Sequence, residues 1–169
     1  QGEGPWVGSR QIFVRFLGCD ISCRYCDTPA ARSNPESQAW QTCAVQTSWE
    51  TDSIETVPNP VASADLMKFC TRLVVPGPSR PTISLTGGEP LLHQEFLAEW
   101  LPAARERFGI YLETAGIHAD AMRHINGLVD VISMDFKLPS ATGLRPYWDE
   151  HRAFLTAVSD ANLFVKAVV

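Results

Sequence analysis

Hydrophobic positions along the chain gather in short runs rich in β-branched and aromatic residues, each bounded by Gly, Pro or Asn, and this pattern is typical of strands. Between the runs, apolar residues recur at helical spacing. The strands expected from these runs span residues 12–18, 83–86, 110–114, 129–136 and 163–169. The expected helices begin near Ser63, cover residues 96–108 with a kink at Pro102, cover residues 118–125, and begin at Pro146.

This alternation of strands and helices predicts an α/β fold built on a parallel sheet with right-handed crossovers. From the pattern alone, a partial barrel and an open doubly wound sheet are both possible. In either fold, functional residues are expected at the carboxyl ends of the strands. Residues 29–62 are the exception, because they are rich in Pro, Ser, Thr and Gln and show no clear period. We expect an inserted loop there that can serve as a lid.

The length of 169 residues is consistent with a single domain over residues 1–169. The 14 Lys and Arg against 19 Asp and Glu, with no basic cluster, argue against a nucleic-acid-binding surface. No apolar run approaches the roughly 18 residues that span a membrane. The chain lacks an initial Met, so we expect it to be part of a longer one. It closes on the strand expected at 163–169 with no helix after it, so we expect the domain to be incomplete at its C-terminus.

Three of the five cysteines follow the first expected strand at the spacing C-x3-C-x2-C. Cys19, Cys23 and Cys26 can each bind one iron of a single cubane, which leaves the fourth iron open for chemistry. The alternative is a zinc site completed by Cys43, Cys70 or a histidine, although a second C-x2-C pair is missing. Clustering of this kind in a chain with an odd number of cysteines favours metal chemistry in a reducing compartment such as the cytoplasm.

Together with Tyr25, which precedes the last cysteine, this spacing resembles the signature of the radical S-adenosylmethionine enzymes. In that family the open iron binds the amino and carboxylate groups of S-adenosylmethionine, whose cleavage gives a 5′-deoxyadenosyl radical. A second motif supports the resemblance. Residues 86–90 (TGGEP) are similar to the family's GGEP segment, in which the backbone holds the methionine amino group. The resemblance implies a partial (β/α) barrel, here truncated after its fifth strand.

Within that family, the segments QGEGPWVGSRQIFVRFLGC, CDTPAA, SLTGGEPLL, YLETAG and MDFKLPSATG resemble the 7-carboxy-7-deazaguanine synthases. These are ring-contracting carbon–nitrogen lyases that convert 6-carboxy-5,6,7,8-tetrahydropterin to 7-carboxy-7-deazaguanine in the queuosine pathway. The resemblance implies a 4Fe–4S cluster, S-adenosylmethionine and Mg²⁺ as cofactors, a flavodoxin- or ferredoxin-type reductant, and room for a homodimer. The alternative is a radical activating enzyme that generates a glycyl radical on a protein partner.

The resemblance also implies roles for individual residues, none of them an acid–base catalyst. The implied metal ligands are Cys19, Cys23, Cys26 and Thr28, the last for magnesium; the implied cofactor contacts are Tyr25, Gly88, Glu113, Asp135 and Lys137; and the implied substrate contacts are Gln1, Gly2, Glu3, Arg15 and Thr86. Arg15 lies inside an apolar strand, where an unpaired guanidinium is costly, so we expect an anionic partner for it, from the ligand or from the protein. Without the resemblance, Thr28 is also a residue that can cap a turn before a proline.

One stretch departs from the pattern of better-known members, which have Ser-Pro-Lys where this chain has Asp135-Phe136-Lys137. Asp135 can bind a ribose hydroxyl, a cation or the cofactor's ammonium group, and Glu113 can join it. The alternative is an ion pair between Asp135 and Lys137 with a structural role only. An Asp-x-Lys sequence also occurs in glycyl-radical activating enzymes. The remaining cysteines and the four histidines show no pattern that predicts a site.

Overall fold

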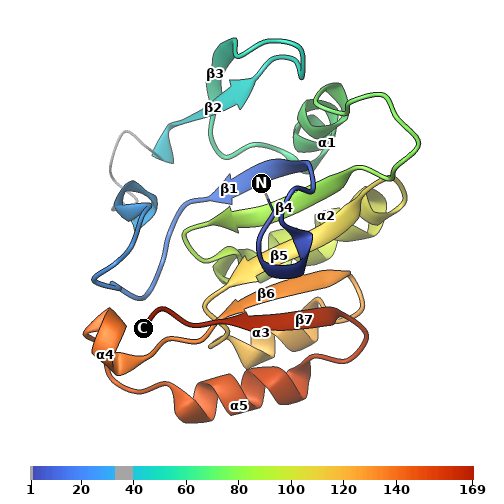
Figure 1. The fold of residues 1–169 in the computed structure, drawn as a ribbon. Coiled ribbons are helices and arrows are strands. Elements are labelled where there is room, and N and C mark those ends of the chain that lie inside the picture. The colour runs from blue at the N-terminus through green and yellow to red at the C-terminus, as the bar shows by residue number, and fades with distance from the viewer. Residues whose placement is uncertain (1, 33–39) are drawn as a thin grey trace.

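The computed structural model describes residues 2–32 and 40–169. Five parallel strands form one sheet in the order β1-β4-β5-β6-β7 (Figure 1). This confirms the expected α/β class and the parallel sheet. The strands of this sheet are β1 (Gln11–Phe16), β4 (Thr82–Gly87), β5 (Gly109–Thr114), β6 (Val131–Asp135) and β7 (Asn162–Lys166).

Helices pack against one face of this sheet. They are α1 (Ser63–Arg72), α2 (Gln94–Arg105), α3 (Ala119–His124) and α5 (Trp148–Ala157), and a short α4 (Pro139–Thr142) follows β6. Alternating side chains of the central strands, such as Leu85, Leu112 and Ile132, meet Trp100 of α2 and Phe154 of α5 in one buried core. Burial of this apolar surface holds the helices to the sheet. In the described part of the chain, no helix is long and apolar enough to cross a membrane.

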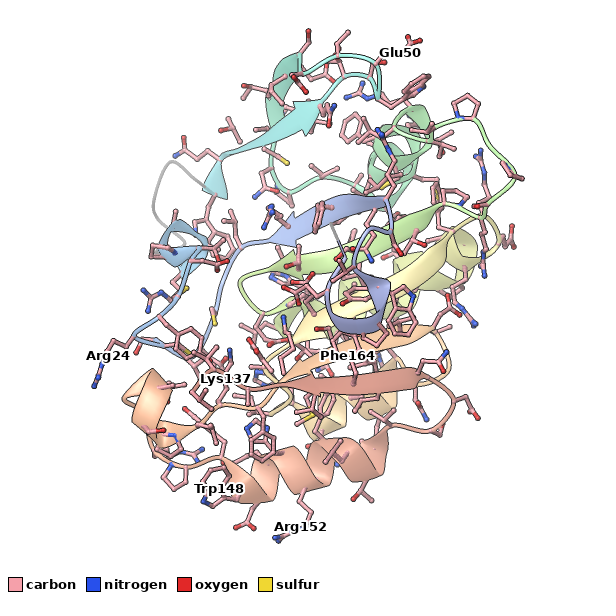
Figure 2. The ribbon with its side chains drawn as sticks, in the orientation of Figure 1. Arg24, Glu50, Lys137, Trp148, Arg152 and Phe164 are labelled. Carbon is pink, nitrogen blue, oxygen red and sulfur yellow. The ribbon has the colours of Figure 1, made fainter. Side chains whose placement is uncertain are left out.

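The opposite face of the sheet is crossed by the N-terminal segment. Its 3₁₀ helix η1 (Gly4–Trp6) lies in front of the sheet in Figure 1. Trp6 stacks on Phe164 of β7 at 5.9 Å between ring centroids and meets Tyr111 of β5 edge-on at 6.3 Å. Figure 2 shows Phe164 beside this segment, while Trp148 and Arg152 project outward from α5. A doubly wound sheet carries helices on both faces, whereas here the second face is left for this segment and for a cavity.

The insert at residues 29–62 differs from the expected loop. It contains a 3₁₀ helix, η2 (Pro29–Arg32), and an antiparallel hairpin of β2 (Thr42–Gln46) and β3 (Ile54–Pro58). Residues 33–39 lie outside the described part. The hairpin stands beside α1 (Figure 1), where Glu55 pairs with Arg72. No residue of the hairpin strands lines the cavity described below, whereas Arg32 of η2 does. A lid formed by the insert stays a prediction.

Two strands expected to be buried are partly exposed. β1 and β7 are the outer strands of the five-stranded sheet, and each therefore has a neighbour on one side only. Phe13 of β1 is 37% exposed and Val165 of β7 is 48% exposed. The helices expected from Ser63 and Pro146 begin at Ser63 and Trp148.

Candidate active site

A cavity of about 580 Å³ opens at the carboxyl ends of the parallel strands. Each strand supplies a side chain to its wall: Arg15 from β1, Thr86 from β4, Glu113 from β5, Asp135 from β6 and Lys166 from β7. Arg15 is paired in register with Thr86, and Asp135 with Lys166. Because side chains alternate between the faces of a strand, these residues share the face that the helices leave open. The carboxyl ends of the strands are where the sequence predicts function.

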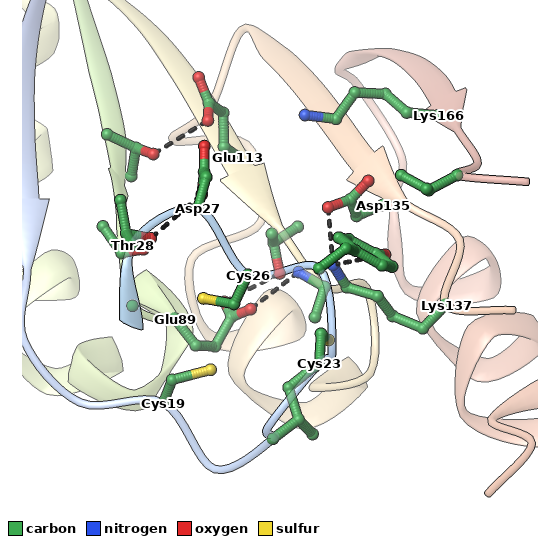
Figure 3. Close-up of a pocket in the computed structure, with 18 of the residues that line it drawn as sticks. Cys19, Cys23, Cys26, Asp27, Thr28, Glu89, Glu113, Asp135, Lys137 and Lys166 are labelled. Carbon is green, nitrogen blue, oxygen red and sulfur yellow. Dashed lines mark hydrogen bonds and ion pairs between the residues drawn. The ribbon is translucent and has the colours of Figure 1, made fainter. Parts of the chain in front are cut away.

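The three clustered cysteines lie on the loop after β1 and line this cavity as free thiols (Figure 3). The loop is fixed by the backbone, because the Arg24 amide donates to the Thr142 carbonyl at 2.9 Å and the Cys26 amide to the Cys23 carbonyl at 3.2 Å. Burial raises the pKa of Cys19 and of Cys23, so both thiols are protonated until a metal displaces the proton.

In the described part of the chain, no three His, Cys, Asp or Glu side chains converge closely enough to hold one metal ion. An iron–sulfur cubane does not require its three cysteines to converge on a single ion, since each thiolate binds a separate iron. Cys43 in β2 and Cys70 in α1 are away from the cavity. Burial raises the pKa of Cys70 to about 12, as expected for a structural thiol in an apolar core. The donor set therefore fits the cluster better than the zinc alternative.

The turn after β4 brings backbone close to the cysteine loop. The Gly88 amide donates to the Phe16 carbonyl at 2.8 Å, and the Glu89 amide donates to the Gly18 carbonyl at 2.8 Å. A Cβ at Gly88 would lie 1.9 Å from that Gly18 oxygen, so only glycine fits this approach. The turn is therefore packed directly against the backbone at the start of the cysteine loop, and Gly87 and Gly88 line the cavity beside the cysteines.

Glu89 locks this turn to the end of β5. Its side chain is 1% exposed. One carboxylate oxygen accepts from the Leu91 amide at 3.1 Å and the Thr114 hydroxyl at 2.9 Å, and the other accepts from the Ala115 amide at 2.8 Å. Burial raises the pKa of Glu89, and these three donors oppose that rise by favouring the charged form. The sequence gives no direct signal of this bracing role beyond the glutamate of the GGEP motif itself.

Two further carboxylates on the wall have separate partners. Glu113 accepts from the Thr86 hydroxyl at 2.9 Å and from the Ser84 hydroxyl at 3.3 Å, and burial raises its pKa. Asp135 instead pairs with the Lys137 ammonium at 2.7 Å (Figure 3). Glu113 and Asp135 thus line the same cavity with separate protein partners, and a joint contact of the two carboxylates with the cofactor stays a prediction.

The Asp135–Lys137 ion pair faces the cavity and reaches the cysteine loop. The Lys137 ammonium lies 3.4 Å from the Tyr25 hydroxyl and 5.3 Å from the centroid of its ring. Burial alone would lower the pKa of Lys137, but the adjacent Asp135 carboxylate outweighs it and holds that pKa above its usual value. The pair is thus both an ion pair, as the structural alternative requires, and part of the cavity wall.

The N-terminal segment closes one side of the cavity with Gly2 and Glu3. The Glu3 carboxylate accepts from the Ser133 hydroxyl at 3.3 Å and pairs with Lys166. Burial works against the charge on Lys166, but Glu3 raises its pKa. Gln1 lies outside the described residues. Sequence reasoning missed Lys166, and its only signal was a cation placed at the end of an expected strand.

Arg15 differs from its expected environment. Its side chain is exposed at the cavity, over the Phe13 ring at 5.2 Å, because β1 is an outer strand. Among the described residues, no carboxylate lies within 4.0 Å of its guanidinium. The burial expected for Arg15 is therefore wrong, and of the two expected partners, protein or ligand, the ligand stays a prediction. The group is open to a ligand.

Thr28 also lines the cavity, beside a carboxylate that the sequence reasoning passed over. Its hydroxyl donates to Asp27 at 3.3 Å and lies 3.4 Å from the Gly87 carbonyl. The Ala31 amide donates to the Thr28 carbonyl at 2.9 Å, so Thr28 also begins the turn into η2. Oxygen groups of this kind suit a hard cation. An acidic residue directly before Thr28 was the available signal.

Comparison with known proteins agrees with the family that the cysteine and GGEP motifs resemble. A family model described as the radical SAM superfamily matches residues 13–165. The chain is 38% identical over 170 residues to a 7-carboxy-7-deazaguanine synthase of Geobacter sulfurreducens, an alignment that covers all of this chain and 66% of that protein. It is 36% identical over 172 residues to the synthase of the same name from Methanopyrus kandleri, again covering all of this chain and 66% of the relative. The chain thus spans just under two thirds of the length of these relatives.

Proposed function

The chain belongs to the radical S-adenosylmethionine superfamily, which uses a 4Fe–4S cluster and S-adenosylmethionine, and we propose that it acts as a 7-carboxy-7-deazaguanine synthase. The reaction would convert 6-carboxy-5,6,7,8-tetrahydropterin to 7-carboxy-7-deazaguanine. The observation that carries the proposal is the shared cavity. Arg15, Glu3 and Thr86, proposed as substrate contacts, line the same 580 Å³ space as the three cysteines. Similarity to two synthases along the whole chain supports it.

The cofactor end of the cavity would be formed by the cysteine loop and the adjacent turn. Cys19, Cys23 and Cys26 would hold the cluster, and the backbone at Gly88 would receive the methionine amino group. When bound, the cluster and S-adenosylmethionine supply the species that removes a hydrogen atom from the substrate. Tyr25, Glu113, Asp135 and Lys137 would contact the cofactor, and the last two present a carboxylate and an ammonium 2.7 Å apart for its polar groups.

The substrate end would be formed by β1, β7 and the N-terminal segment. The Arg15 guanidinium has no protein anion within 4.0 Å among the described residues, and its planar fork pairs with a carboxylate through two hydrogen bonds. Lys166 lies on the same cavity, where Glu3 shares it. The Glu3 carboxylate can accept hydrogen bonds from N–H groups of the pterin ring. The chain thus offers cations for the carboxyl group and a carboxylate for the ring.

A magnesium ion would sit near Thr28 and Asp27, where a hydroxyl and a carboxylate 3.3 Å apart face the cavity. Mg²⁺ keeps several water ligands and takes few from protein, so two oxygen groups are sufficient. We expect Thr28→Ala to weaken the magnesium dependence of turnover, and Asp27→Asn to do so more strongly because it removes a charge. Turnover measured against magnesium concentration checks this, with Ser22→Ala on the same loop as the control. Turnover that ignores magnesium in the parent protein contradicts the assignment.

The product differs from the substrate by the loss of one ammonia, so the overall ring contraction consumes no electrons. The work left to this chain is to orient the carboxypterin, exclude water and fix charges around it, because the cofactor carries the difficult chemistry. A flavodoxin- or ferredoxin-type reductant would prime the cluster. A homodimer remains compatible with the proposal. Nothing in the cavity favours a protein glycine as the substrate.

The decisive experiment incubates the anaerobically reconstituted protein with carboxytetrahydropterin, S-adenosylmethionine, magnesium and a chemical reductant. Mass analysis is expected to find 7-carboxy-7-deazaguanine together with 5′-deoxyadenosine. Cleavage of S-adenosylmethionine without any pterin product would contradict the substrate while leaving the family membership intact. A reaction with Cys19→Ala in place of the parent protein serves as the control and should give neither product.

A further inference from the structure

His151 of α5 is buried directly behind the cavity wall, with 1% of its surface exposed. Its Nε2 atom lies 3.1 Å from the Lys137 backbone amide, and its Nδ1 atom lies 2.9 Å from the Gly116 carbonyl. The ring also stacks on Phe136 at 4.4 Å between centroids. One histidine therefore joins the segment after β5 to the segment after β6.

The two partners define the protonation state of this ring. A carbonyl oxygen can only accept, so Nδ1 must carry a proton. A backbone amide can only donate, so Nε2 must be bare. The imidazole is therefore neutral, with its proton on Nδ1. A doubly protonated ring would set an N–H group against the Lys137 amide and break that contact.

The contact between His151 and the Lys137 amide bears on the cavity because the Lys137 side chain reaches the cysteine loop. The Lys137 side chain pairs with Asp135 and reaches Tyr25, which lies between two of the cluster cysteines. Figure 3 shows the Lys137 ammonium beside Asp135 and the cysteine loop. Arg152, the residue after His151, points away from the sheet in Figure 2. Fixing the backbone of Lys137 thus fixes the position of an ammonium that bridges the end of β6 and the cysteine loop.

We propose that His151 is a positioning residue of the cofactor site. Its neutral ring links the Lys137 amide to the Gly116 carbonyl, so that the Lys137 ammonium stays between Asp135 and Tyr25. The inference rests on the proposed cofactor role of Lys137 and is independent of which substrate is bound. Its failure is therefore distinguishable from failure of the proposed reaction, since cofactor affinity reports on one and pterin product on the other.

The surroundings favour this neutral form. Burial lowers the pKa of His151, and the Gly116 carbonyl partly offsets that effect. The charged groups facing the ring are Lys137 and Asp135 from the end of β6 and Glu150 on α5 itself. Lys137 opposes a positive ring, while the two carboxylates favour one. The loop after β5 presents the Gly116 carbonyl to Nδ1.

Two substitutions separate the polar role from packing. His151→Phe keeps an aromatic ring for Phe136 to stack on but removes both hydrogen bonds. His151→Gln keeps one donor and one acceptor. Affinity for S-adenosylmethionine, followed by its effect on the electron paramagnetic resonance spectrum of the reduced cluster, is expected to fall about tenfold in His151→Phe and to recover in His151→Gln. His124→Phe, on the exposed face of α3, is the matched control and should leave the affinity unchanged.

Two readouts do not depend on the cofactor. Hydrogen exchange at the Lys137 amide is expected to speed up in His151→Phe and to slow again in His151→Gln. The ¹⁵N NMR spectrum of the reconstituted parent protein with its cluster oxidised is expected to show His151 protonated at Nδ1 alone at pH 8. A proton on Nε2 in that spectrum overturns the proposal even if His151→Phe does not fold. Unchanged affinity and unchanged exchange in a folded His151→Phe variant overturn it as well.

Discussion

Five side chains from five strands meet over one edge of the sheet, although the first and last are 151 positions apart in the sequence. Positive and negative side chains come from different strands of the sheet. Arg15 and Lys166 come from the two outer strands, while Glu113 and Asp135 come from inner ones. Of the two cations, Lys166 pairs with Glu3, whereas Arg15 has no carboxylate within 4.0 Å among the described residues. Arg15 is therefore the cation available to pair with an anionic ligand.

Replacing Arg15 should therefore affect the substrate and spare the cofactor. We expect Arg15→Ala to weaken binding of carboxytetrahydropterin about tenfold, since a hydrogen-bonded charge pair contributes about 1.5–3 kcal/mol and the exposure of this one places it at the low end. Affinity for S-adenosylmethionine should not change. Calorimetric titration of both ligands checks the two expectations, with Arg10→Ala, outside the cavity, as the control. Parent-like pterin binding by Arg15→Ala would remove Arg15 from the substrate site.

The three cysteines make a sharper, all-or-none prediction. Changing Cys19, Cys23 or Cys26 to Ala leaves two thiolates for a cubane that needs three, so we expect iron retention to be lost. Cys43→Ala and Cys70→Ala should retain iron, because both thiols lie away from the cavity. Iron content and visible absorbance after anaerobic reconstitution provide the measurement. One zinc per chain in protein purified without oxygen would contradict the cluster assignment.

The elements that carry these residues are held together at their ends by a few buried polar contacts. The turn after β4 is joined to the end of β1 and to the loop after it by two backbone hydrogen bonds of 2.8 Å, donated by Gly88 and Glu89. The Glu89 carboxylate then reaches β5, and His151 of α5 reaches the segments after β5 and β6. Each contact links successive strand ends, so the geometry of the site depends on contacts between neighbouring elements.

Glu89→Gln tests the strongest of these links. The amide keeps one accepting oxygen, but its NH₂ group faces donors that the carboxylate satisfied, so we expect destabilisation of about 1–3 kcal/mol. The thermal midpoint of the reconstituted protein should fall accordingly. Glu106→Gln, at the exposed end of α2, should leave it unchanged. If Glu89→Gln matches the parent in thermal midpoint, the turn after β4 is held by its backbone contacts alone.

For the molecule as a whole, local patterns in the sequence were sufficient for the helices, the parallel strands and the cysteine and GGEP motifs. Properties set by the order of strands were not predicted. The exposure of Arg15 follows from the outer place of β1, and the link of Glu3 to Lys166 joins the two ends of the chain. The hairpin of β2 and β3 was missed because its strands are short and its register shows only in the pairing. His151 had no sequence signal, since its two partners belong to other loops.

The protonation of His151 should affect how the free energy of unfolding of the whole molecule depends on pH. Because its folded-state pKa is lowered, the unfolded chain binds more protons than the folded one as pH falls through the ordinary histidine value of about 6.5. The stability that His151 contributes is therefore complete above that pH and is lost as pH falls toward and through its folded-state pKa. The change in the free energy of unfolding that one proton can cause is limited to about 1.4 kcal/mol per pH unit. Buried Glu89 and Glu113, whose pKa values are raised, give slopes of the opposite sign, so the difference between variants is the informative quantity.

We expect the thermal midpoint of the parent protein to fall more steeply between pH 7.5 and pH 5 than that of His151→Gln, which has no proton to gain. His124→Gln, at an exposed position of α3, is the control and should follow the parent. Circular dichroism of the reconstituted proteins across this range provides the measurement. Parallel curves for the parent and His151→Gln would mean that the ring takes up its proton without breaking the contact to Lys137. In that case the neutral imidazole would not be what holds the end of β6 in place.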